Sequence, residues 1–159
     1  MKVMVLGGGG RAHAVVHAFS KSKITDELHC CPGNPGIAKL AECHAGDPCS
    51  VESTTKLCRD LGIDLVFVGP EAPLVAGTAD ALREAGILVM GPGASGARLE
   101  GSKAFSKQFM KRHNIPTSDF DICTNLEECI AALKKRSAPF VVKADGLAVG
   151  KGVVVAETL

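Results

Sequence analysis

The residues with the plainest chemistry lie near the end of the sequence, in the run Lys143-Ala144-Asp145-Gly146-Leu147-Ala148-Val149-Gly150-Lys151-Gly152. Valine-rich segments flank this run, and because valine packs well in a pleated sheet, we expect two strands joined by a loop. Glycine lets backbone amides approach an anion closely, and lysine adds a mobile positive charge. The pattern is typical of a phosphate site, although an ordinary hairpin with solvated lysines has the same pattern.

This loop differs from the Walker A phosphate loop. Walker A has four residues between its first glycine and its Gly-Lys pair, then Ser or Thr, and it opens a helix. Here three residues separate Gly146 from Gly150, and Gly152 follows the lysine. The chain then returns to a valine strand, so the sequence predicts a flexible flap over a nucleotide.

A second glycine-rich segment, Gly7-Gly8-Gly9-Gly10, follows the expected buried strand 3–6. Apolar residues at 12, 15, 16 and 19 have the spacing of an amphipathic helix. Strand, glycine loop and helix open a Rossmann-like unit with an anion at the helix N-terminus. The acidic residue that nicotinamide-binding folds carry after the second strand is missing, since that strand runs into Pro32-Gly33-Asn34-Pro35-Gly36. An oxidoreductase is therefore the least favoured function.

Strands and helices are expected to alternate through the N-terminal part of the chain. The expected strands are residues 3–6, 28–31, 63–68 and 87–90, and the expected helices are residues 11–19, 50–61 and 75–85. This alternation predicts an α/β fold with a doubly wound parallel sheet. Glu71, expected on a rigid loop at the same sheet edge, either bonds ribose hydroxyls or a substrate amine, or stays solvated.

The pattern changes near Ser102, which is expected to cap a helix. Lys103 lies in the first turn of this helix, where the helix dipole attracts anions, whereas Lys107 and Lys111 are expected to be solvated. Thr124 and Glu127 have the spacing of a capping box that starts another amphipathic helix. We place the domain boundary at Ser102, with a Rossmann-like domain over 1–102 and the start of a second domain over 103–159.

Composition excludes several classes of function. The net charge is +1, and Trp and Tyr are absent, which disfavours a nucleic-acid or membrane-surface binder. Seven cysteines without a Cys-x-x-Cys pair or a secretion signal indicate reduced thiols and a cytoplasmic location. The clustered group of Cys30, Cys31, Cys43, His44 and Cys49 lacks zinc-ligand spacing. Core positions are expected for Cys58 and Cys129, and an exposed helix face for His13 and His17.

Six stretches together resemble one family over the whole chain. They are Gly7-Gly8-Gly9-Gly10-Arg11-Ala12-His13-Ala14, Pro32-Gly33-Asn34-Pro35-Gly36, Gly69-Pro70-Glu71-Ala72-Pro73-Leu74, Leu99-Glu100-Gly101-Ser102-Lys103, His113-Asn114-Ile115-Pro116-Thr117 and 142–152. They are similar to the N-terminal portion of glycinamide ribonucleotide synthetase (phosphoribosylamine–glycine ligase), of the ATP-grasp superfamily. The resemblance implies that 1–102 is a pre-ATP-grasp domain and that 103–159 begins an incomplete ATP-grasp domain.

The resemblance also implies an activity and a set of sites. The activity is ATP-dependent ligation of glycine to 5-phosphoribosylamine in purine synthesis. The residues implied to bind ATP are Lys103, Lys143, Asp145, Gly146, Gly150, Lys151 and Gly152, and those implied to bind the phosphoribosyl substrate are Gly8, Gly9, Gly10, Arg11, Asn34 and Glu71. No catalytic residue is expected within the chain, and the ligands for Mg²⁺ or Mn²⁺ are expected beyond Leu159.

Three departures from the family's pattern concern single residues. Ala12 stands where the family usually has Glu, Gly93 where it has Ser or Thr, and Val149 where it has Ala. Since the metal site is expected elsewhere, we expect the chain to be a truncated form that does not catalyse the reaction alone. Two alternatives remain open, another ATP-grasp carboxylate–amine ligase and a non-catalytic nucleotide-binding module.

Overall fold

The computed structural model describes residues 1–148 and 150–158. The chain divides into two compact units, Met1–Ala97 and Arg98–Leu159, which we describe separately. Within the described residues, no helix is long and apolar enough to cross a membrane.

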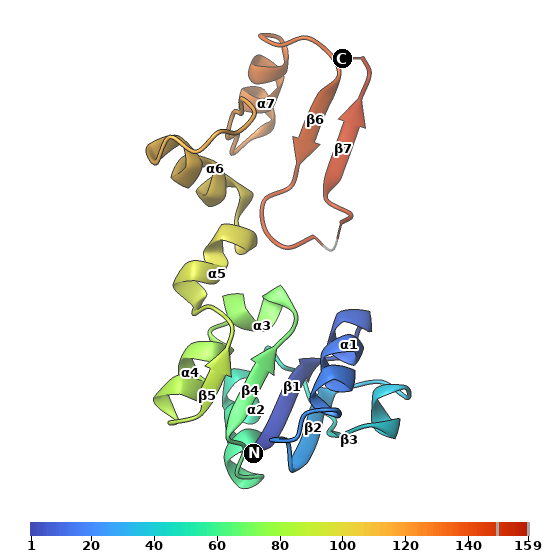
Figure 1. Cartoon of the computed structure of the whole chain (residues 1–159). Coiled ribbons are helices and arrows are strands. Elements are labelled where there is room, and N and C mark those ends of the chain that lie inside the picture. Colours follow the sequence, from blue (N-terminus) through green and yellow to red (C-terminus); the bar gives the residue numbers. More distant parts are fainter. Residues whose placement is uncertain (149, 159) are drawn as a thin grey trace. The chain divides into compact units, whose positions relative to one another are not determined.

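The first unit is built on a parallel sheet of five strands in the order β3-β2-β1-β4-β5 (Figure 1). The strands are β1 (Lys2–Gly7), β2 (Glu27–Pro32), β3 (Glu42–Cys43), β4 (Leu65–Val68) and β5 (Leu88–Met90). The helices are α1 (Gly10–Phe19), the 3-10 helix η1 (Ile37–Lys39), α2 (Val51–Asp60), α3 (Glu71–Val75), α4 (Thr78–Glu84) and α5 (Ala94–Gly101), which runs into the second unit. This architecture confirms the predicted α/β fold class.

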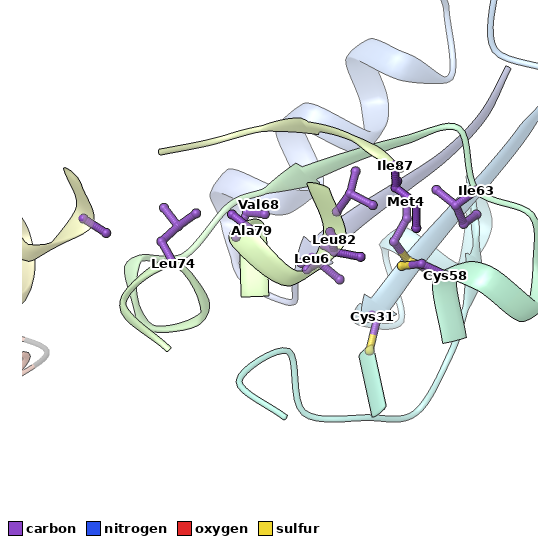
Figure 2. Close-up of a cluster of buried hydrophobic side chains, with 12 residues drawn as sticks. Met4, Leu6, Cys31, Cys58, Ile63, Val68, Leu74, Ala79, Leu82 and Ile87 are labelled. Atoms are coloured by element: carbon purple, nitrogen blue, oxygen red, sulfur yellow. The ribbon is translucent and has the colours of Figure 1, made fainter. Parts of the chain in front are cut away.

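Both faces of the sheet are covered, as a doubly wound fold requires. Successive residues of a strand point to opposite faces. Met4 and Leu6 join the larger core, which includes residues of α2, α3 and α4 (Figure 2), whereas Val5 joins the smaller one with Ala12 and Val16 of α1. Because β1 is the central strand and is buried on both faces, it reads as a continuous apolar run.

Two predictions in this unit were wrong in detail. The predicted helix over 75–85 begins too early: α3 ends at Val75, Gly77 adopts a left-handed φ of 90°, and α4 starts at Thr78. Glu71 lies at the start of α3 rather than on a loop. Pro70 precedes this helix, and Pro73 falls in its first turn, where no backbone N–H is needed for the helix ladder. The sequence reading also missed η1, α5 and the two-residue strand β3.

The second unit contains α6 (Lys103–Arg112), α7 (Leu126–Leu133) and the antiparallel pair β6 (Phe140–Lys143) and β7 (Val153–Ala156). The predicted valine hairpin is confirmed. So is the cap of α6, where the Ser102 hydroxyl accepts from the Phe105 amide at 3.1 Å. Among the described hydrophobic side chains of this unit, only that of Phe140 is buried.

Three details of the second unit correct the sequence reading. The cap of α7 is shifted by one residue: Asn125 accepts from the Glu128 amide, and the Glu128 carboxylate accepts from Thr124. Lys107 is not simply solvated, because its ammonium donates to Thr117 and Ser118. Cys129 is only half-buried, unlike Cys58, which is fully buried as predicted.

Candidate phosphate and nucleotide sites

The glycine segment after β1 forms the first candidate site. Residues Gly7 to Ala12, Gly69 and Pro70 line a hollow of roughly 190 Å³. Gly9 is the N-cap of α1 and has no side-chain oxygen to offer. The first amides of a helix have no acceptor within the helix, and they carry a partial positive charge. The hollow therefore presents backbone donors suited to an anion.

The glycines of this loop serve two different purposes. A Cβ atom on Gly8 would lie 2.7 Å from the Gly33 carbonyl oxygen, so a side chain does not fit between the two backbones. A Cβ on Gly9 or Gly10 would meet no atom within 4 Å. Gly8 thus permits close packing of two loops, whereas Gly9 and Gly10 leave open space over the helix N-terminus.

Asn34 holds the two loops together. Its amide nitrogen donates to the Gly8 carbonyl at 2.9 Å, and its Oδ1 accepts from the Gly36 and Ile37 amides at 2.8 and 2.9 Å. These bonds start η1 and fix the position of the glycine loop. The structure places Asn34 beside the predicted substrate residues, where it orients the backbone.

Arg11 and Glu71 are brought together from α1 and α3. The guanidinium donates twice to the carboxylate, over 2.8 and 3.2 Å. These hydrogen bonds, together with Glu71's own backbone amide, hold the pKa of that carboxyl below its ordinary value. The Arg11 side chain is 73% exposed, so a ligand in the hollow can reach its charge.

The second candidate site lies within the second unit. Lys103, Lys143 and Asp145 line a groove of about 980 Å³ between α6, α7 and β6. Lys103 is half-buried and Lys143 is exposed. The groove is also lined by Lys107 and Arg136 and by Asp119 and Asp121, so it carries four basic and three acidic side chains. Its small excess of positive charge, with Lys103 and Lys143 close to the loop, suits an anionic ligand.

Asp145 ties the loop after β6 to the start of α6. Its carboxylate accepts from the Ser102 hydroxyl at 3.0 Å and from the Ala104 amide at 3.1 Å. The Ala104 amide is the main cause that lowers the pKa of Asp145. The Lys103 ammonium donates to the Gly146 carbonyl at 2.6 Å. The sequence reading did not foresee this anchor, because 43 residues separate Ser102 from Asp145.

The rest of the loop is shaped by its glycines. Gly146 and Gly150 have positive φ values of 85° and 76°, which side chains rarely adopt. The Ala144 amide donates to the Gly152 carbonyl at 2.7 Å and closes the base of the loop. Lys151 is exposed beside this base. Val149, one of the departures from the family's pattern, lies outside the described residues.

Comparisons with known proteins identify the family of the chain. Residues 1–100 match the family described as phosphoribosylglycinamide synthetase, N domain, and residues 101–159 match its ATP-grasp (A) domain. A phosphoribosylamine–glycine ligase of Streptomyces coelicolor is 55% identical over 157 residues, covering 99% of this chain and 38% of the relative. One from Clostridium acetobutylicum is 45% identical with the same coverage. The chain spans about two fifths of the length of these curated relatives.

Solved structures give the same assignment. The crystal structure of phosphoribosylamine–glycine ligase from Thermotoga maritima matches with a TM-score of 0.81 and 35% identity, over 99% of this chain and 36% of that one. The biotin carboxylase domain of Hydrogenobacter thermophilus 2-oxoglutarate carboxylase has a TM-score of 0.78 at 21% identity, over 99% of this chain and 38% of that one, and so shares the fold. Because the first family match alone covers more than half of the sequence, the chain belongs to the phosphoribosylglycinamide synthetase family.

Proposed function

We propose that this chain supplies the phosphoribosyl site and a triphosphate-contacting loop of a ligase. The reaction uses ATP to join glycine to 5-phosphoribosylamine, giving glycinamide ribonucleotide, ADP and phosphate. The observation that carries the proposal is the open N-terminus of α1, where unobstructed glycines and Arg11 surround a small hollow. Because the relatives are much longer than this chain, the activity is proposed for the whole protein.

In the first unit, the amides of Gly8, Gly9 and Gly10 and the charge of Arg11 would bind the substrate's phosphate group. Glu71 would hold the guanidinium in place. The remaining lone pairs of its carboxylate oxygens would accept hydrogen bonds from the ribose hydroxyls. Asn34 would act by positioning, since its amide is already engaged by the loop backbone. We assign these roles to the domain over 1–102.

In the second unit, Lys103 and Lys143 would neutralise the triphosphate, and the loop carrying Asp145, Gly146, Gly150, Lys151 and Gly152 would cover it. The γ-phosphoryl group passes to the glycine carboxylate and forms an acyl phosphate with release of ADP. The amine of phosphoribosylamine then attacks the carbonyl carbon and displaces phosphate. Such chemistry depends mainly on positioning and charge neutralisation. We assign this role to the domain that begins at Lys103.

Magnesium or manganese is implied by the fold family, and the carboxylase domain from Hydrogenobacter thermophilus was crystallised with magnesium ADP. Mg²⁺ prefers carboxylate and water oxygens. Within the described residues the groove offers Asp119, Asp121 and Asp145. Asp121 pairs with Arg136, and Asp145 is committed to the start of α6, which leaves a single carboxylate. The described residues therefore do not fit a magnesium site.

A cytoplasmic location agrees with the state of the thiols. All seven cysteines are free. Free thiols are typical of a reducing compartment, and the reaction needs ATP from the same compartment.

Calorimetric titration of the chain with ribose 5-phosphate, a stable fragment of the substrate, tests the first site. We expect Arg11→Met to weaken binding about tenfold or more, since charge-assisted hydrogen bonds are the stronger kind. His17→Gln, at an exposed position of the same helix, serves as the control and should bind normally. Equal binding by both variants would contradict the assignment of the site.

Product analysis with the protein from its complete natural gene tests the reaction. We expect ADP release that requires both glycine and 5-phosphoribosylamine. Other ligases of this fold use different acids, as the N5-carboxyaminoimidazole ribonucleotide synthetases of similar fold show by their name. Turnover with bicarbonate or formate in place of glycine would favour such an alternative.

A further inference from the structure

Three side chains of types that can bind a metal meet at the edge of the first unit's sheet, and none of them lines the glycine hollow. His29 lies on β2, opposite Glu42 of the edge strand β3. His44 continues that strand by one more backbone bond, from its amide to the Cys30 carbonyl at 2.8 Å. Since alternate residues of a strand share a face, Glu42 and His44 both point toward the His29 ring.

The ligand atoms are spaced as a bound ion would require. His29 Nδ1 lies 3.1 Å from His44 Nε2 and 3.7 Å from a Glu42 oxygen, and His44 Nε2 lies 3.9 Å from the other Glu42 oxygen. Bonds of about 2.0–2.1 Å to a tetrahedral zinc ion separate its ligands by roughly 3.4 Å. The three atoms can thus surround one ion after small side-chain adjustments.

The environment of His29 gives a second, independent indication. Its side chain is 95% buried, yet its Nε2 has no hydrogen-bond partner among the described residues. The nearest acceptor is a Glu27 oxygen at 3.6 Å, and Lys2 holds that carboxylate in place. In metal sites, the second nitrogen of a ligating histidine usually donates to a carboxylate, which fixes the ring. Glu27 stands where that carboxylate belongs.

We propose that His29, Glu42 and His44 bind one zinc ion, with Glu27 orienting His29 and a fourth position open to water. Two imidazoles and one carboxylate suit zinc rather than magnesium. Glu42 is exposed, which gives an ion a path to the site. The proposal does not depend on the proposed ligase activity.

The ion would stabilise the edge strand β3 and the loop that connects β2 to β3. β3 has only two residues, and the chain from 33 to 41 between β2 and β3 carries Asn34, which positions the glycine loop. Ligands at both ends of this segment would limit its opening. Cys30 and Cys43 alternate to the other face, and the Cys30 thiol donates to the Gly7 carbonyl. Cys31 shares the face of His29 but packs into the larger core, and among the described residues the group within 4.8 Å contains only His29, Glu42 and His44.

Zinc titration of the chelator-treated chain, followed by native mass spectrometry, tests the proposal. We expect one tightly bound zinc ion, no displacement by a large excess of magnesium, and a zinc-dependent rise in Tm. His44→Gln should abolish that ion and the rise in Tm. Glu27→Gln should weaken binding about 10- to 100-fold, as changes around metal ligands do.

His17→Gln and Cys43→Ser are matched controls, one imidazole and one thiol outside the cluster, and both should bind zinc normally. The His44 side chain is 15% exposed and belongs to neither core cluster, so its variant should fold, which circular dichroism checks. A cobalt-loaded chain should show no thiolate charge-transfer band. Absence of tight binding, or equal binding by wild type and a folded His44→Gln variant, would overturn the proposal and leave a histidine–histidine hydrogen bond.

Discussion

The two units of the chain differ most in how much of their apolar surface they bury. In Met1–Ala97, Met4, Leu6 and Val16 are fully buried, and two core clusters pack against the sheet. In Arg98–Leu159, Leu126 and Val154 remain 74% and 62% exposed. Burial of apolar surface is the main favourable contribution to folding. Within the described residues, the first unit therefore packs two core clusters on its sheet, whereas the second unit holds its loop through a few polar bonds.

The difference extends to how each candidate site is built. The glycine loop of the first unit is fixed by backbone contacts and by Asn34, which leave little freedom. The loop after β6 depends on Asp145 and on Lys103. The first site is therefore held mainly by backbone contacts, and the second by side-chain bonds that single substitutions can remove.

The largest expected effect comes from replacing one leucine by alanine in each unit and comparing the losses of stability. Leu82→Ala, at a fully buried position of the larger core, should lower the free energy of unfolding by about 2–5 kcal/mol, because it leaves a cavity. Leu126→Ala, at an exposed position on α7, should change it by less than about 0.5 kcal/mol. Urea denaturation followed by circular dichroism measures both. Similar losses would show that the second unit also depends on a packed core.

A smaller effect is expected from alanine at two neighbouring glycines. Gly8→Ala should destabilise the first unit by about 1–3 kcal/mol, since its methyl group would press against the Gly33 carbonyl. Gly9→Ala has open space and a negative φ, so it should fold normally but project a methyl group over the helix N-terminus. Thermal unfolding and ribose 5-phosphate titration separate the two effects. A destabilised Gly9→Ala variant would contradict this division of roles.

The sequence predicted most helices and strands of both units, since α6, α7 and the β6–β7 hairpin also lie where expected. Continuous apolar strands and glycine loops mark a doubly wound sheet through local pattern alone, and β1, β2, β4 and β5 appear where expected. The two-residue strand β3 has too little sequence for any periodicity. From the sequence, His44 was grouped with four cysteines and no zinc-ligand spacing was found, so His29 and Glu42 were not recognised as its neighbours. These three side chains come from two paired strands, not from a local motif. The link from Ser102 to Asp145 was equally invisible, because it joins distant residues.

The anchor of the second unit is tested by Asp145→Asn. Loss of the charged acceptor should speed amide hydrogen exchange in the loop roughly 2- to 10-fold, the effect of about one hydrogen bond. Exchange in β1 should not change. Since the folded-state pKa of Asp145 is lowered, its contribution is present above the ordinary value of 3.8 and is lost as pH falls through the lowered pKa. Asp119→Asn, at an exposed position of the same unit, is the control, and faster exchange there would contradict a specific anchor.

The smallest expected effect concerns the ion pair in the first unit. Arg11→Met should raise the pKa of Glu71 toward its ordinary value of 4.5, because the guanidinium is the main cause of its lowering. Carboxyl chemical shifts followed by NMR over a pH titration measure this directly. The pair stabilises the fold above that ordinary value, and the contribution is lost as pH falls through the lowered pKa. Because Arg11 is largely exposed, solvent screens the pair, and the free energy of unfolding should fall by less than about 1 kcal/mol. A much larger loss would mean that the ion pair also stabilises the packed core. The stability of the first unit would then depend on a residue of its candidate site.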